Sequence, residues 1–278
     1  MATANPSFIH IPGPGETVHV YHANGFPAGV YEVFLQTLSA HFNVYAMNGR
    51  AVGAQEHPSH SDWQIYADDL IAFLDAQKIG PVIGIGHSMG ASSTVLAALK
   101  RPDLFKALVL IEPAMVDWPL RLLMKLLPKR VIHNSKLVKG TLNKPEHWPD
   151  ETSYLKYIKK FSGYRLFSDA TFEAFVRYAI KPVGGGHGLV FSNRWEAHNY
   201  TQPPYLIGRL KKLARLNIPT VAICGADNKF FNQALWQKWQ LVQPDSVFMK
   251  NTQFGHLMPL EGPVETVQMI MQGLAELG

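Results

Sequence analysis

The feature that most limits how this chain can fold is a serine set between two glycines, directly after an apolar run. Residues 81–85 read Pro-Val-Ile-Gly-Ile, Gly86-His87-Ser88-Met89-Gly90 follows, and a stretch rich in Ala and Ser comes next. That order predicts a buried strand, a tight turn and a helix. A serine in such a turn has a strained backbone for which the flanking glycines make room, so its hydroxyl projects above the edge of the sheet. The start of the helix supplies unpaired N–H groups and a positive dipole, which suit a developing oxyanion.

Strand and helix patterns alternate on both sides of this turn. The expected elements, in chain order, are strand 18–22, helix 31–41, strand 44–47, helix 62–77, strand 81–86, helix 89–100 and strand 107–111. The pattern resumes with strands at 218–224 and 247–249 and a closing helix at 264–277. Such alternation predicts an α/β fold, in which a mostly parallel central sheet is flanked by helices.

The composition changes over residues 115–208, which are rich in Lys, Leu and aromatic residues and lack the alternation. We expect a core of residues 1–114 and 209–278 that is interrupted by a mainly helical cap at 115–208. The cap holds 14 Lys+Arg and 7 Asp+Glu, so it carries the whole positive excess of a chain with net charge +5. Because no zinc finger, RNA-binding aromatic signature or basic-helix pattern accompanies this charge, we expect no nucleic-acid partner.

The glycine run also approaches a dinucleotide-binding fingerprint. Residues 84–90 read Gly-Ile-Gly-His-Ser-Met-Gly, and Glu112 ends the next strand at the distance of a ribose-binding acid. However, the third glycine is one position late and the strand lies well inside the domain. Two further loops favour hydrolytic chemistry instead. His22-Ala23-Asn24-Gly25-Phe26-Pro27 can aim a backbone N–H at the serine, and Phe254-Gly255-His256, after the last strand, can supply a general base.

On these three motifs the chain resembles the α/β-hydrolase fold superfamily, among its cap-containing serine hydrolases. The resemblance covers the whole of the predicted core. It implies that Ser88 is the nucleophile and His256 the general base. It also implies an oxyanion hole formed by the backbone N–H groups of Met89 and Phe26.

Two carboxylates compete for the acid of the implied triad. The family usually places this acid shortly after the strand that here ends at Gly225, with two residues between Gly and Asp, whereas only Ala226 precedes Asp227. Asp227 is the first choice, because it keeps the order Ser, Asp, His along the chain. Glu112 is the alternative, because haloalkane dehalogenases of the same fold can carry the acid at the end of the strand after the elbow helix.

The resemblance implies a carboxylesterase-like enzyme that hydrolyses esters of small to medium acyl chains through an acyl-enzyme. Serine at the elbow argues against epoxide hydrolase and haloalkane dehalogenase chemistry, which uses Asp there. The same triad also serves thioester, lactone and carbon–carbon bond hydrolysis and cofactor-free perhydrolysis, and the fold can form a catalytically silent binding module. The expected partner is a small-molecule ester, with no cofactor and no metal, and the sequence specifies no oligomeric state.

Several side chains border the implied site and are candidate substrate contacts: His22, Asn24, His87 and Trp118. Trp118 opens a predicted helix that Asp117 caps, with Arg121 and Lys125 on one face and leucines on the other. We expect these leucines to cover the cleft. The alternative is a lid whose basic face touches an anionic lipid surface.

The remaining signals concern the environment of the protein. The chain has no run of 18 apolar residues, its first residues lack a secretory pattern, and Cys224 is the single cysteine. We therefore expect a cytoplasmic protein without an integral membrane segment. Cys224 is expected to be a buried small hydrophobe and not a nucleophile. His57 and His60 have no carboxylate partner at metal spacing, so we expect no metal site there.

Overall fold

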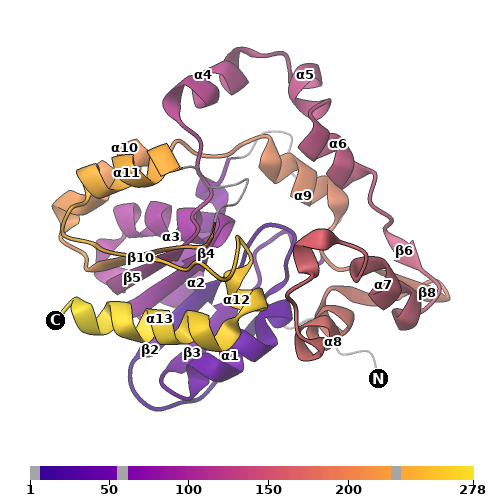
Figure 1. Cartoon of the computed structure of the whole chain (residues 1–278), viewed down its shortest axis with the longest axis horizontal. Coiled ribbons are helices and arrows are strands. Elements are labelled where there is room, and N and C mark those ends of the chain that lie inside the picture. The colour runs from indigo at the N-terminus through magenta and orange to yellow at the C-terminus, as the bar shows by residue number, and fades with distance from the viewer. Residues whose placement is uncertain (1–6, 55–61, 227–232) are drawn as a thin grey trace.

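The computed structural model describes residues 7–54, 62–226 and 233–278, and these residues are organised around a seven-stranded sheet (Figure 1). The strand order is β1-β3-β2-β4-β5-β9-β10, and only the β1–β3 pair is antiparallel. The strands are β1 (Phe8–Ile11), β2 (Thr17–Tyr21), β3 (Asn43–Met47), β4 (Val82–His87), β5 (Phe105–Ile111), β9 (Thr220–Cys224) and β10 (Val247–Lys250). The predicted mostly parallel α/β architecture is confirmed.

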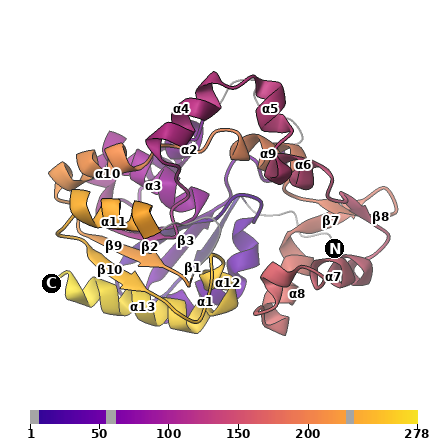
Figure 2. The same cartoon turned by 45° about the horizontal axis from the view of Figure 1, so that its top comes forward.

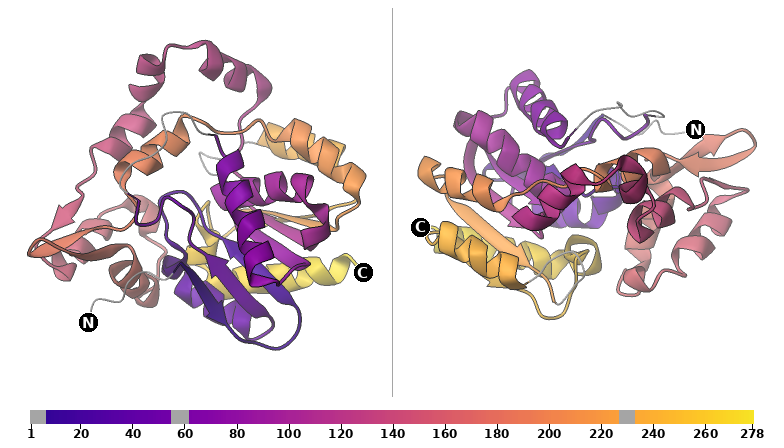
Figure 3. Two further views of the ribbon diagram at one scale, coloured as in Figure 1. Left: turned by 180° about the vertical axis from the view of Figure 1, so that it is seen from behind. Right: turned by 90° about the horizontal axis from the view of Figure 1, so that it is seen from above.

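Helices cover both faces of this sheet (Figure 3). One face is covered by α2 (Gln64–Gln77), α3 (Met89–Lys100), α10 (Ile207–Leu213) and α11 (Gln233–Val242). The opposite face is covered by α1 (Glu32–Ser39) and α13 (Pro263–Glu276), which lie side by side. The short helix α12 (Met258–Glu261) leads into α13. This arrangement explains why every residue of the central strand β4 is buried.

Alternate residues of one strand supply the two halves of the core. In β5, Leu108 belongs to the buried cluster that contains Leu70 and Trp239, and its neighbour Val109 belongs to the other cluster, with Phe34 and Ile270. Successive side chains of a strand point to opposite faces of a sheet. Continuous apolar runs such as that of β5 are therefore what a sheet covered on both sides requires.

Between β5 and β9 the chain leaves the main sheet and forms helices and a small sheet of its own (Figure 2). The helices are α4 (Trp118–Leu126), α5 (Lys129–His133), α6 (Lys136–Leu142), α7 (Glu151–Ile158), α8 (Asp169–Tyr178) and α9 (Asn193–Tyr200). The small sheet has the antiparallel order β6-β8-β7, with strands β6 (His147–Trp148), β7 (Ile180–Val183) and β8 (Gly186–Leu189). Sequence patterns did not predict these strands, because they are short and interrupted by glycine and proline.

Helices α4, α5 and α6 rise away from the main sheet as an arch, a name we use for residues 118–142 (Figures 1 and 2). Helix α4 contains no buried residue, and Leu123 and Leu126 are 51% and 75% exposed. The expectation that its leucines cover the cleft is therefore wrong. No helix in the described ranges is long and apolar enough to cross a membrane.

Candidate active site

Ser88 lies at the sharp turn between β4 and α3. Its backbone has φ 54° and ψ −115°, a combination that a residue with a side chain rarely adopts. Its N–H donates to the carbonyl of Ile111 at 2.9 Å, and its carbonyl accepts from Ala114 N–H at 3.1 Å. A Cβ atom on Gly90 would stand 2.2 Å from the carbonyl oxygen of Tyr21, so the turn can pass close to β2 only with glycine there. The hydrogen bonds to Ile111 and Ala114 and the close contact with β2 therefore fix this strained turn.

The imidazole of His256 connects Ser88 to Glu112. His256 Nε2 lies 3.0 Å from Ser88 Oγ, and His256 Nδ1 lies 3.1 Å from Glu112 Oε2. Because a carboxylate only accepts hydrogen bonds, Nδ1 carries the proton and Nε2 accepts from the serine hydroxyl. This is the arrangement in which a histidine can remove a proton from a serine.

Glu112 follows β5 and is 1% exposed. Its backbone also has a positive φ, 48°, and its N–H donates to the carbonyl of Ile223 at 2.9 Å. Besides His256, its carboxylate accepts from the N–H of Gly225, which donates to Oε1 at 2.6 Å. Two directed hydrogen bonds therefore fix the orientation of this buried carboxyl group. Asp227, the first choice from the sequence, lies outside the described residues.

The two backbone groups implied as an oxyanion hole belong to Met89 and Phe26. Met89 is the first residue of α3, so its N–H has no acceptor within the helix. Phe26 lies in the loop after β2, and its N–H donates to the carbonyl of Ala23 at a long 3.3 Å. Asn48 Oδ1 accepts from the N–H of Ala28 at 2.8 Å and so fixes the far end of this loop.

His87, the neighbour of Ser88, links three loops of the site through a buried chain of hydrogen bonds. Ala23 N–H donates to the hydroxyl of Tyr31 at 3.1 Å, and that hydroxyl lies 2.7 Å from His87 Nδ1. His87 Nε2 donates to the carbonyl oxygen of His256 at 2.8 Å. Burial, with the nearby His256, lowers the pKa of His87 to about 3, so its ring is neutral. Both ring nitrogens therefore bind groups of the protein itself, and the side chain is 2% exposed.

The two ring nitrogens of His22 are also hydrogen bonded to backbone groups of the protein. One ring nitrogen, Nδ1, lies 2.8 Å from the carbonyl of Ala23, and Nε2 accepts from Gly49 N–H at 2.8 Å. Burial lowers its pKa to about 4, and the side chain is 1% exposed. The structure therefore places His22 inside the protein, where it joins the loop after β2 to the loop after β3.

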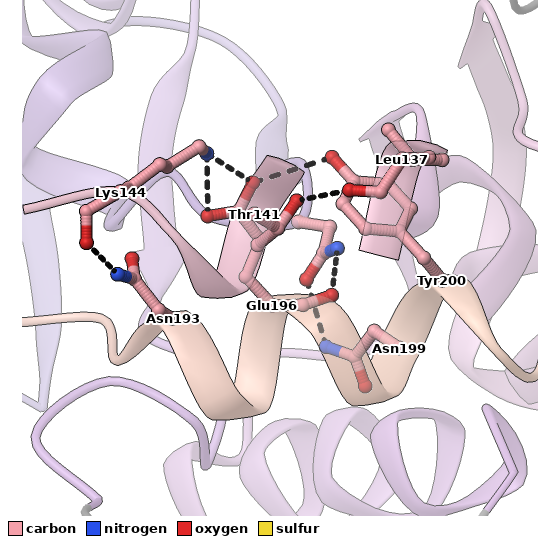
Figure 4. Close-up of polar contacts among 8 residues, drawn as sticks. Leu137, Thr141, Lys144, Asn193, Glu196, Asn199 and Tyr200 are labelled. Atoms are coloured by element: carbon pink, nitrogen blue, oxygen red, sulfur yellow. Dashed lines mark hydrogen bonds and ion pairs between the residues drawn. The ribbon is translucent and has the colours of Figure 1, made fainter. Parts of the chain in front are cut away.

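Asn24 connects that loop to the insertion between β5 and β9. Figure 4 shows the insertion side of this contact, with Lys144, Glu196 and Asn199 labelled. The side-chain amide of Asn24 donates to the carbonyl of Glu196 at 3.0 Å and accepts from Asn199 at 2.8 Å. The carboxylate of Glu196 packs against Gly25 and forms an ion pair with Lys144, whose Nζ lies 2.7 Å from Oε1. Only Asn24 in this network was singled out from the sequence. Its partners lie more than 170 residues away, and no local pattern marks them.

Trp118 lies apart from these residues and is 55% exposed. Its ring contacts that of Tyr205 at 5.6 Å, and both line a cavity of about 320 Å³ beneath α4. Arg121, Lys125 and Arg209 also line this cavity. The cavity therefore places Trp118 beside three cations and the carboxyl group of Asp62.

Two further expectations concern metal and thiol chemistry. Within the described ranges, no group of three His, Cys, Asp or Glu side chains is arranged to hold a metal ion. Cys224 is buried at the end of β9, as expected. Burial and the nearby Glu112 raise the pKa of its thiol to about 12, so the reactive thiolate is scarce.

Comparison with known proteins gives matches at three levels. A family model described as the alpha/beta hydrolase fold matches residues 18–263. The chain is 35% identical over 96 residues to a probable alcohol acetyltransferase of Wickerhamomyces anomalus, covering 34% of this chain and 28% of the relative. It is 32% identical over 101 residues to the 2-(acetamidomethylene)succinate hydrolase of Mesorhizobium japonicum, covering 36% of each. These matches span about a third of each relative's length. The crystal structure of E-2-(acetamidomethylene)succinate hydrolase superposes with a TM-score of 0.79 at 20% identity, over 96% of this chain and 94% of that chain.

Proposed function

Because the chain belongs to the α/β-hydrolase fold family, we propose that it is a serine hydrolase that cleaves carboxylic esters of small to medium acyl chains. Its membership of this family confirms the resemblance inferred from the sequence. The observation that carries the proposal is the hydrogen-bonded chain from Ser88 through His256 to Glu112, with distances of 3.0 and 3.1 Å. Such a chain turns a weakly nucleophilic hydroxyl into a nucleophile at neutral pH.

In the first half of the reaction, Ser88 Oγ attacks the carbonyl carbon of the ester and its proton passes to His256 Nε2. The carbonyl oxygen becomes an oxyanion, which the N–H groups of Met89 and Phe26 stabilise. The amide of Phe26 turns from its long bond to Ala23 toward the stronger, charged acceptor. Collapse of the intermediate breaks the bond to the alcohol, which leaves with the proton from His256.

In the second half, His256 removes a proton from water, and the resulting hydroxide attacks the acyl carbon. The carboxylic acid is released, and Ser88 recovers its proton. We propose Glu112 as the acid of the triad, in place of the sequence-based preference for Asp227. Glu112 already accepts from Nδ1, and its charge stabilises the imidazolium that forms twice in each cycle.

We also propose that residues 115–208 act as a cap over a core made of residues 1–114 and 209–278. The contact between Asn24 and α9 supports this division, because it joins the insertion to the loop that carries Phe26. A cap in this position selects the acyl or alcohol part of the substrate.

Labelling with a fluorophosphonate probe, followed by turnover of p-nitrophenyl esters of increasing chain length, tests the proposal. Wild type should react with the probe and hydrolyse at least one short or medium ester. Ser88→Ala should do neither, and the matched exposed variant Ser162→Ala should behave as wild type. Turnover that persists in Ser88→Ala would refute the proposed nucleophile. A probe-reactive Ser88 without ester turnover would refute the proposed substrate class and retain the serine mechanism.

A further inference from the structure

The arch concentrates the exposed apolar side chains of the described structure. Eight of the fourteen large hydrophobic side chains that are exposed belong to these 25 residues. They are Trp118, Leu120, Leu122, Leu123, Leu126, Val131, Leu137 and Leu142, with exposed fractions from 42% to 75%. Isolated exposed hydrophobic residues are ordinary, but a cluster of this kind marks a surface that another apolar phase covers.

The same element carries an unneutralised positive charge. The arch and the residue before it, Asp117, together contain six Lys and Arg and one Asp, a net charge of +5 that equals the net charge of the whole chain. In the described part of the structure, Arg121, Lys125, Arg130, Lys136 and Lys139 form no ion pair. A partner that complements this surface must therefore be both apolar and negatively charged.

The apolar and charged faces of helix α4 are oriented opposite to those of an ordinary surface helix. Arg121 and the exposed Lys125 line the cavity with Arg209 and Asp62, whereas Leu123 and Leu126 do not line it and are exposed to solvent. A surface helix normally packs its apolar face against the core and presents its charges to water. Trp118 and Tyr205 stand at the edge of the same cavity, and such amphipathic rings favour the boundary between lipid and water.

We propose that the arch is a docking surface for an anionic lipid bilayer. Its leucines enter the boundary between headgroups and acyl chains, and its cations bind the anionic headgroups. A second copy of the chain is a poorer occupant, because docking arch against arch would oppose two surfaces of net charge +5. Ala114, four residues before α4, is hydrogen bonded to Ser88, so docking holds the serine close to the lipid interface.

Vesicle flotation tests this proposal directly and does not depend on hydrolytic activity. Wild type should float with vesicles of equal parts phosphatidylcholine and phosphatidylglycerol. It should not float with phosphatidylcholine alone, and raised salt should release it, because salt screens exposed charges. Wild-type protein that stays unbound with the anionic vesicles, or binds both vesicles equally at all salt concentrations, would overturn the proposal.

Two sets of variants separate the apolar and the charged contributions. Leu123→Asn with Leu126→Asn should lower the vesicle partition coefficient about tenfold. Its matched control is Leu241→Asn on α11, where the side chain is 82% exposed, and this control should bind as wild type. Because all three leucines are exposed, none of these variants removes core packing.

The charge variant is Arg130→Gln, Lys136→Gln and Lys139→Gln, and its partition coefficient should fall about 100-fold at low salt. The control, Lys160→Gln, Lys211→Gln and Arg215→Gln, has the same net charge with the changes outside the arch, and it should bind as wild type. Equal losses in both triples would show that net charge alone attracts the protein and would refute a docking surface. Light scattering tests for a second copy of the chain. If wild type is an oligomer and Leu123→Asn with Leu126→Asn converts it to a monomer, a second copy is the occupant and the lipid proposal is refuted. Hydrolysis of a soluble ester should be unchanged in every variant, which keeps this test separate from that of Ser88.

Discussion

Ser88 and Glu112 share an uncommon backbone conformation at corresponding points of neighbouring strands. Both have positive φ values, 54° and 48°, and each lies just after a strand of the adjacent pair β4 and β5. Positive φ is costly for residues with a Cβ, so it persists only where the surroundings fix it. Here Ser88 N–H binds Ile111 and Glu112 N–H binds Ile223, which continue the sheet ladder past the strand ends. The two side chains are thereby brought to opposite sides of one imidazole.

This geometry predicts which carboxylate supports catalysis. Glu112→Gln should lower kcat by about four orders of magnitude, because the amide no longer stabilises the imidazolium and can hold the wrong tautomer. Asp227→Asn should leave kcat close to the wild-type value. Steady-state kinetics on the best p-nitrophenyl ester checks both. A large loss in Asp227→Asn with normal turnover in Glu112→Gln would assign the role to Asp227.

A second prediction concerns the buried chain through Tyr31 and His87. Tyr31→Phe removes the hydroxyl that joins Ala23 N–H to His87 Nδ1, so the loop of Phe26 and the loop of His256 lose a shared anchor. We expect kcat to fall about tenfold with KM little changed, since misplaced groups affect the transition state most. Tyr154→Phe, which alters another buried tyrosine, is the control. A rise in KM without a fall in kcat would show that Tyr31 serves substrate binding instead.

The sequence was most informative about residues whose environment is local. The turn at Ser88 could be predicted because the strand, the turn and the helix that position this residue are contiguous. The contact between Glu112 and His256 joins residues 144 positions apart, and it depends on the path of two loops over the sheet edge. Spacing therefore favoured Asp227, whereas hydrogen-bond geometry favours Glu112. His22 and His87 border the site in sequence, but their ring nitrogens face inward, which no spacing reveals.

At the scale of elements, helix α9 is the part of the insertion that touches the loop carrying Phe26. Lys144 forms an ion pair with Glu196 of α9, and the exposed fractions of their side chains are 34% and 10%. Lys144→Met should destabilise the protein by about 2 kcal/mol, because the mostly buried Glu196 side chain loses the ammonium group that it binds. Lys144→Met combined with Glu196→Leu should recover part of that loss. Urea unfolding measures both values, and a double variant that loses as much as the sum of the singles would contradict this account.

Element-scale prediction succeeded where strands and helices are long and covered on a defined face. The strands from β2 to β5 and helices α2 and α3 lie within a few residues of their expected positions. It failed within residues 115–208. There β6, β7 and β8 are too short to show a periodicity. The amphipathic pattern of α4 predicted which residues share a face, but not which face points toward the protein. Which face a helix buries depends on its tertiary partner, and the apolar face of α4 has none in the described chain.

At the scale of the whole molecule, three buried histidines govern stability in acid. Burial lowers the pKa of His19 to about 3, of His22 to about 4 and of His87 to about 3. Below about pH 6.5 the unfolded chain binds protons at these positions and the folded protein does not. The contribution of these histidines to stability is therefore fully present near neutral pH, and it is lost as the pH falls from about 6.5 toward 3.

His19 allows this prediction to be tested away from the site. Its ring packs between Tyr21 and Phe73, and neither ring nitrogen has a hydrogen-bond partner in the described structure. His19→Leu should reduce the loss of unfolding free energy between pH 7 and pH 5 by about 2 kcal/mol. The exposed residue His41, changed to Gln, is the control. Urea unfolding at both pH values provides the comparison, and an unchanged difference in His19→Leu would contradict the role of burial.

The alternation of strands and helices was sufficient to predict a mostly parallel sheet, but not its full order. The antiparallel edge strand β1 was missed, because it is a four-residue strand at the margin of the sheet. The central pairs β2–β4 and β4–β5 bring the ends of β2, β4 and β5 together. The residues of the candidate site therefore lie at one edge of the sheet, although they are far apart in the sequence.

The most direct test of the central claim is to locate the acyl group on the protein during turnover. A p-nitrophenyl ester is mixed with wild-type protein, the reaction is stopped in acid, and the tryptic peptides are analysed by mass spectrometry. We predict one acylated peptide, residues 79–100, with the added mass on Ser88, and no acylated peptide in Ser88→Ala. An acyl group on any other residue, or ester turnover without acylation of Ser88, would contradict the account.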